Sequence, residues 1–136
     1  MQTQQTIQIN TSAAHLWDVL TLPEFTKKYM FNCGVNSNWE LGGPITWEGN
    51  YQGYEVFQKG SILEIEKFKR LKYSTFDPNY GMEDIPENYT HITYAIEESE
   101  SGCALTIINE KFNSGEEHAD SGWDEIMNAI KEVAEL

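Results

Sequence analysis

The side chains best suited to chemistry in this chain are aromatic rings that carry a polar atom. Three of them, Trp47, Tyr73 and Tyr94, share the phase of the apolar positions in alternating stretches, and Trp123 does so in a helical stretch. Tyr and Trp add a hydrogen-bonding group that a purely apolar core does not need. Such rings around a few polar tips typically line a small-molecule pocket. A filled core of amphipathic rings is the alternative.

Two further residues have the phase of these rings. Asn109 shares the apolar phase of Leu105 and Ile107, and a buried Asn needs hydrogen-bond partners. A ligand would supply them, or else the backbone or water at a strand end. Met127 would add adaptable packing. The predicted ligand-binding residues are therefore Trp47, Tyr73, Tyr94, Asn109, Trp123 and Met127.

The spacing of the other reactive residues predicts no catalytic residue, metal or cofactor. None of His15, His91 and His118 has a Cys, His or carboxylate at a ligand spacing on its own element. The sequence has no GxSxG motif and no cysteine with a recognisable catalytic partner motif. It also has no glycine-rich phosphate-binding loop. Only His118 is placed to reach a cavity mouth, and a surface position is its alternative.

Composition limits the classes of partner. The chain has 136 residues, enough for a single domain over 1–136, and its net charge is −13. Phosphate backbones need a basic surface, so we expect no nucleic acid partner. No apolar run approaches the roughly 18 residues of a membrane helix, so we expect no membrane insertion. Without a signal-peptide pattern, Cys33 and Cys103 are predicted to be reduced thiols of a cytoplasmic protein.

Hydrophobic periodicity predicts a definite order of elements. Strands are expected at residues 3–10, 35–41, 45–48, 54–67, 71–75, 89–97 and 103–112. Short helices are expected at 13–20 and from Pro23 through Met30 to a stop near Cys33-Gly34. Residues 77–88 form the longest loop, either a binding loop or a solvated hairpin connection. A capping box at 114–117 opens a final helix, whose apolar stripe is Ala119, Trp123, Ile126, Met127, Ile130, Val133 and Ala134.

This order predicts an α+β fold. A lone amphipathic helix must bury its stripe, and the only large partner here is a sheet. We therefore expect a curved antiparallel sheet of six to seven strands wrapped around the long C-terminal helix, with two short helices after the first strand.

Several segments together resemble a known family. They are "INTSAAHLWDVLTLPEFTKKYM", "WELGGPITWEG", "GSILEIEKFKRLKYSTF", "ITYAIEESESGCALTIINEKF" and "SGWDEIMNAIKEV". Their order is similar to the helix-grip arrangement of the START/SRPBCC (Bet v 1-like) superfamily, in its branch of activator of heat-shock-protein ATPase homologues. The resemblance implies a cavity between sheet and helix that holds an apolar or amphipathic molecule.

Three functions follow as hypotheses. The first is binding of a lipid-, sterol- or polyketide-like small molecule in that cavity. The second is a protein-interaction module acting on a chaperone ATPase, as the family name implies. The third is an enzyme of the cyclase or aromatase type, although fold alone does not choose among these.

Overall fold

The structure is a computed structural model that describes residues 2–78, 81–112 and 123–136. Its elements in chain order are β1 (Gln2–Ile9), α1 (Ala13–Thr21), α2 (Pro23–Thr26), β2 (Cys33–Ser37), β3 (Pro44–Tyr51), β4 (Tyr54–Glu66), β5 (Arg70–Thr75), the 3₁₀ helix η2 (Pro86–Asn88), β6 (Thr90–Ser99), β7 (Gly102–Lys111) and α3 (Trp123–Ala134).

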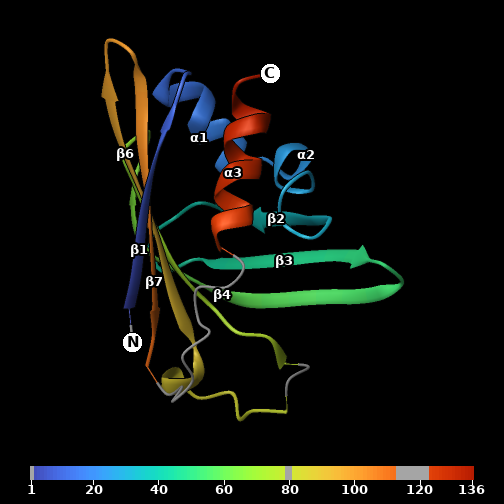
Figure 1. Ribbon diagram of the computed structural model, residues 1–136. Coiled ribbons are helices and arrows are strands. Elements are labelled where there is room, and N and C mark those ends of the chain that lie inside the picture. The colour runs from blue at the N-terminus through green and yellow to red at the C-terminus, as the bar shows by residue number, and fades with distance from the viewer. Residues whose placement is uncertain (1, 79–80, 113–122) are drawn as a thin grey trace.

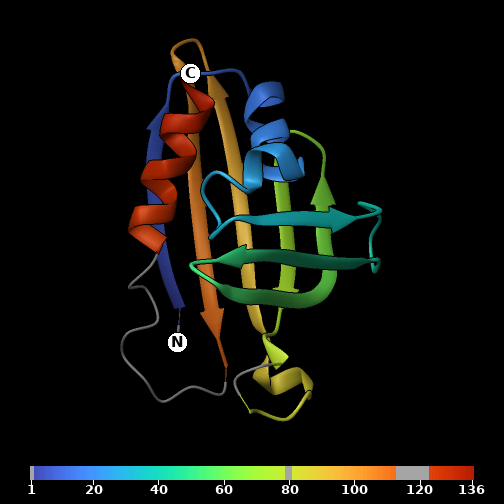
Figure 2. The ribbon, with the colours of Figure 1, turned by 90° about the vertical axis from the view of Figure 1, so that its right-hand side faces the viewer.

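The seven described strands form one antiparallel sheet in the order β1-β7-β6-β5-β4-β3-β2. The long strand β4 pairs with β3 through its first half and with β5 through its second half. Figure 2 shows β2, β3 and the start of β4 running crosswise in front of the other strands. The sheet is therefore strongly bent, and α1, α2 and α3 lie within the bend (Figure 1). The α+β helix-grip prediction is confirmed.

Polar contacts fasten α3 along the edge strand β1. Gln5 Nε2 donates to Asp124 Oδ1 at 2.7 Å, and Lys131 Nζ donates to the Gln8 carbonyl at 2.7 Å. The apolar side of the helix faces the sheet and is buried at Ile126, Met127, Ile130, Val133 and Ala134. The predicted stripe is thus confirmed from Ile126 onward.

Other predictions for this region lie outside the described residues. They are the capping box at 114–117, His118 and the stripe position Ala119.

Alternation along the strands decides which side chains meet the helices. In β6 the buried residues include Ile92, Tyr94 and Ile96, while β7 buries Cys103, Leu105, Ile107 and Asn109. These residues lie on one face because successive side chains of a strand point to opposite sides. We call this face, which contacts α3, the inner face, and the opposite one the outer face.

Two predicted elements are too long, and the strand predicted at residues 45–48 is too short, since β3 spans Pro44–Tyr51. The second helix ends at Thr26 rather than continuing through Met30. Thr26 Oγ1 donates to the Cys33 carbonyl at 3.0 Å and accepts from the Val35 N–H at 3.1 Å, which draws the chain into β2. Phe31 adopts the left-handed region (φ 50°), which cannot continue a helix.

The strand predicted for residues 35–41 ends at Ser37. Ser37 Oγ accepts from the Trp39 N–H at 3.0 Å, and Trp39 itself is left-handed (φ 57°). The local side-chain hydrogen bond competes with the strand ladder. Leu41, at the end of the predicted strand, is exposed.

Two further observations concern the described part of the chain. None of its helices combines the length and apolar character needed to cross a membrane. Cys33 and Cys103 are buried free thiols.

Candidate functional site

Three of the predicted site residues form a row of rings on the inner face. Trp47 of β3 and Tyr73 of β5 have ring centroids 5.8 Å apart, and Tyr73 lies at the same distance from Tyr94 of β6. The hydroxyl oxygens of the two tyrosines are 3.2 Å apart and share a hydrogen bond. All three residues are buried.

Strand register explains why these rings meet. Tyr73 lies opposite Ile92 of β6, and Tyr94 lies opposite Leu71 of β5. The two tyrosines are therefore diagonal neighbours on one face, a separation that long aromatic side chains bridge. Trp47 reaches them because the bend in β4 turns β3 across β5.

Burial keeps the tyrosine hydroxyls protonated. It raises the pKa of Tyr94 to about 12, an effect that the hydrogen bond to Tyr73 opposes. It also raises the pKa values of Tyr73 and Tyr29 well above the usual range, with the neighbouring Tyr94 adding to both shifts. The Tyr29 hydroxyl donates to the Val19 carbonyl at 2.8 Å.

Several polar atoms of the inner face are buried without a described partner. They are the Trp47 indole nitrogen Nε1, Thr3 Oγ1 and Gln5 Oε1, none of which has a hydrogen bond within residues 2–78, 81–112 and 123–136. Buried polar atoms are normally hydrogen-bonded, so each such atom calls for an explanation. A ligand or ordered water at this face would provide one.

The other predicted site residues lie nearby. Asn109 is buried and lies between Thr3 of β1 and Ile92 of β6 in the register. Met127 belongs to the same core cluster as Trp47, Tyr73 and Tyr94, and Trp123 packs against this cluster while half-buried.

Sequence reasoning missed Thr3, Gln5 and Tyr29. The signal for the first two was present, since Thr3 and Gln5 share the strand phase of Ile7 and Ile9. Because both side chains are polar, the hydrophobic pattern did not mark these two positions as part of the inner face.

Within the part of the chain that the structure describes, the inner face carries rings and hydrogen-bonding groups but no nucleophile paired with a base. Burial raises the pKa values of both the Cys33 and Cys103 thiols, which disfavours the reactive thiolate. Among the described residues, no three His, Cys, Asp or Glu side chains are close enough together to hold a metal ion. The arrangement is chemically suited to binding an apolar body that bears an oxygen.

Comparisons with solved structures show the same fold in other proteins. ChR145 from Cytophaga hutchinsonii is 30% identical, with a TM-score of 0.80 over 97% of this chain and 92% of that one. The Aha1 dimer from Colwellia psychrerythraea is 16% identical, with a TM-score of 0.75 over 100% of this chain and 97% of that one.

A third similar structure is DynU16, described as a putative protein in the dynemicin biosynthetic locus. It is 10% identical, with a TM-score of 0.77 over 96% of this chain and 46% of that one.

Curated protein sequences and family models give two further results. No curated protein matches the chain. The family model described as Activator of Hsp90 ATPase homolog 1-like protein matches residues 10–135. Since that match covers nearly all of the 136 residues, the chain belongs to the family of Activator of Hsp90 ATPase homolog 1-like proteins.

Proposed function

We propose that this protein binds an apolar or amphipathic small molecule, of lipid, sterol or polyketide type, between the inner face of the sheet and α3. The observation that carries the proposal is the Trp47 indole N–H, which is buried beside Tyr73 without an acceptor among the described residues. A carbonyl or hydroxyl oxygen of a ligand would accept this hydrogen bond.

The surroundings of Trp47 support the same ligand chemistry. Tyr73 and Tyr94 supply ring area, and Met127 supplies a flexible apolar side chain that adapts to irregular shapes. Asn109, Thr3 and Gln5 offer further polar atoms on this face. The ligand is therefore expected to have a largely apolar body with oxygens near Trp47 and toward β1.

Two comparisons bear on this proposal. Membership of the family supports it through the resemblance, which implies a small-molecule cavity between sheet and helix. The structural neighbour DynU16 is described as a putative protein in the dynemicin biosynthetic locus. The free, buried Cys33 and Cys103 fit a reducing compartment such as the cytoplasm.

The test is thermal unfolding against fatty acids, sterols, flavonoid-like phenols and polyketides. A ligand at about a hundred times its dissociation constant adds ~2.7 kcal/mol to the free energy of unfolding. This corresponds to a rise of several degrees in Tm for a domain of this size. A flat response across all four classes would contradict the proposal.

Two variants locate the site of any binding. Trp47→Phe removes the N–H while keeping a ring, and we expect about tenfold weaker binding of the active class. Trp17→Phe removes another buried indole, on α1, and serves as the matched control with unchanged binding. Met127→Trp should block uptake while the far-UV spectrum stays native. Unchanged binding in both Trp47→Phe and Met127→Trp would place the ligand elsewhere.

One surface feature favours a protein-interaction module as the second candidate. Phe31 and Tyr51 have ring centroids 5.4 Å apart, and Tyr54 is 76% exposed at the tip of the β3–β4 hairpin. Clustered exposed aromatic residues often mark binding surfaces. Affinity purification that recovers one stoichiometric partner, lost with Tyr54→Ser, would support this role.

A further inference from the structure

The outer face has a pocket of its own at the bend of β4. Its volume is about 610 Å³, and its lining includes Thr46, Phe57, Lys59, Ser74, Tyr89 and His91. In the register Thr46 pairs with Lys59, and Ser74 pairs with His91. These residues have the strand phase opposite to Trp47 and Tyr73, so the pocket lies on the other side of the sheet from α3. None of the six predicted site residues lines it.

The floor of this pocket is shaped by the close approach of β4 to β5. A Cβ atom on Gly60 would lie 1.7 Å from the Ser74 carbonyl oxygen, so only glycine allows this approach. The Ser61 N–H donates to Ser74 Oγ at 3.0 Å. The Ser74 hydroxyl is held in place by this contact, and its own hydrogen stays available to an acceptor in the pocket.

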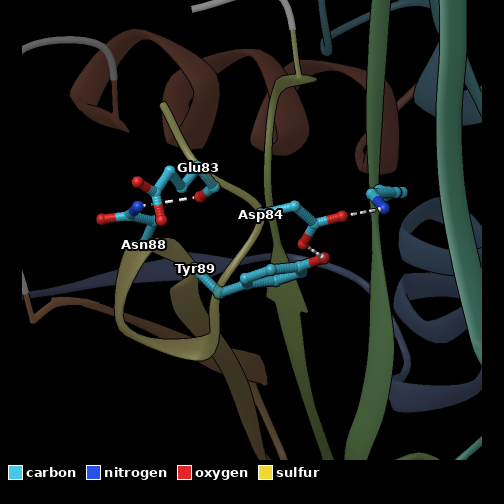
Figure 3. Close-up of polar contacts among 5 residues, drawn as sticks. Glu83, Asp84, Asn88 and Tyr89 are labelled. Carbon is cyan, nitrogen blue, oxygen red and sulfur yellow. Dashed lines mark hydrogen bonds and ion pairs between the residues drawn. The ribbon is translucent and has the colours of Figure 1, made fainter. Parts of the chain in front are cut away.

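A described part of the loop between β5 and β6 forms the wall. Asp84 pairs with Lys59 and accepts from the Tyr89 hydroxyl at 2.6 Å (Figure 3). The Tyr89 ring stacks on Phe76 with centroids 5.0 Å apart. The contact between Lys59 and Asp84 joins residues that are 25 positions apart in the sequence, and it holds this wall against β4.

The described residues of the lining carry no net charge. Its one ammonium and one carboxylate, Lys59 and Asp84, neutralise each other at the partly exposed rim. Burial, aided by nearby Lys72, lowers the pKa of His91, which keeps the imidazole neutral at physiological pH. A neutral imidazole offers one donor and one acceptor. Phe57, Leu63 and Pro86 are apolar.

This combination defines a ligand class. The volume falls within the roughly 300–1,000 Å³ of small-molecule sites, which are mostly apolar with a few fixed polar groups. Hydroxyls of Ser61 and Ser74 and the His91 imidazole provide those groups. An anion would have to displace Asp84 from Lys59 and approach a protein of net charge −13.

We infer that the outer pocket is a second small-molecule site, which takes a neutral aromatic compound bearing hydroxyl or carbonyl oxygens. The ring lies against Phe57 and Pro86, and its oxygen contacts Ser74 and His91. The site is independent of the one proposed on the inner face, because the sheet separates them.

The test uses naphthol as the neutral probe and naphthoate as its anionic counterpart, followed by two-dimensional amide NMR. Thr46→Trp fills the pocket from a half-buried strand position, and Thr46→Val is the matched control that keeps the shape. Met127→Trp fills space at the inner face instead, and it shows whether the naphthol-induced shifts depend on that face. Far-UV spectra and Tm verify that each variant is folded.

We expect naphthol to shift the amide signals of Lys59, Ser74 and His91 with saturation, and naphthoate to bind about tenfold more weakly. Thr46→Trp should abolish these shifts, whereas Thr46→Val and Met127→Trp should keep them. The second site would be overturned if naphthol shifted only the amide signals of inner-face residues. It would also be overturned if the shifts at Lys59, Ser74 and His91 persisted unchanged in folded Thr46→Trp. Tighter binding of naphthoate would overturn the neutral ligand class. Neither result bears on ligand uptake beside Trp47.

Discussion

The hydrogen bond between Tyr73 and Tyr94 allows a quantitative test of the inner-face geometry. Replacing either tyrosine by phenylalanine leaves the other hydroxyl buried, since Tyr73 is 2% and Tyr94 0% exposed. A buried hydroxyl that loses its partner costs about 1–3 kcal/mol, whereas removal of both partners can be nearly neutral. The two substitutions should therefore be strongly non-additive.

The geometry narrows the expected magnitude. The oxygen–oxygen distance of 3.2 Å exceeds the usual range of about 2.5–3.0 Å for O–H···O bonds. We therefore expect each single variant to lose about 1–2 kcal/mol and the double variant to lose no more than a single one. The coupling free energy should therefore be at least about 1–2 kcal/mol, the size of one single-variant loss.

Urea unfolding followed by circular dichroism would measure all four proteins of this double-mutant cycle. Tyr54→Phe is the matched control, because Tyr54 is 76% exposed and its change should stay within about 0.5 kcal/mol. Additive losses from Tyr73→Phe and Tyr94→Phe would show that the two hydroxyls do not bond, and would refute the ring arrangement proposed as the ligand wall.

Two more predictions concern pH and the bend. The pKa of Tyr94 is about 12 when folded and about 10 when unfolded, so the unfolded state loses its proton first. The contribution of Tyr94 to the free energy of unfolding should be complete below pH 10 and fall by about 2 kcal/mol toward pH 12, so stability should fall less steeply in Tyr94→Phe than in the unmodified protein. Urea unfolding at several alkaline pH values measures this, and equal slopes would contradict it. Gly60→Ala should cost roughly 3–5 kcal/mol, because its Cβ meets the Ser74 carbonyl at 1.7 Å. Gly34→Ala, whose nearest atoms are at 3.2 Å, should cost much less, and similar Tm values for both would contradict the close approach of β4 to β5.

Local patterns in the sequence were sufficient to predict most of the fold. Period-two alternation predicted that Trp47, Tyr73, Tyr94 and Asn109 point to one face, and all four are buried there. This works because a strand with one buried face has a single acceptable phase. The binding role assigned to these residues is still a prediction.

The errors arose where side chains bond locally. The hydrogen bonds of Thr26 Oγ1 and Ser37 Oγ end α2 and β2 early, although the apolar spacing continues beyond both points. Such bonds depend on how the backbone turns, which hydrophobic periodicity does not report.

The sequence by itself determined the class of fold, the face of each strand and the aromatic character of the inner lining, since these depend on spacing within single elements. Only the tertiary structure decided which of those residues meet. It brought Trp47 to Tyr73, and it placed Asp84 on Lys59 across 25 residues of chain. Both contacts lie at the bend in β4, where the strands approach so closely at Gly60 and Ser74 that only glycine fits. Gly60 and Ser74 also line the outer pocket, which likewise combines residues from separate strands.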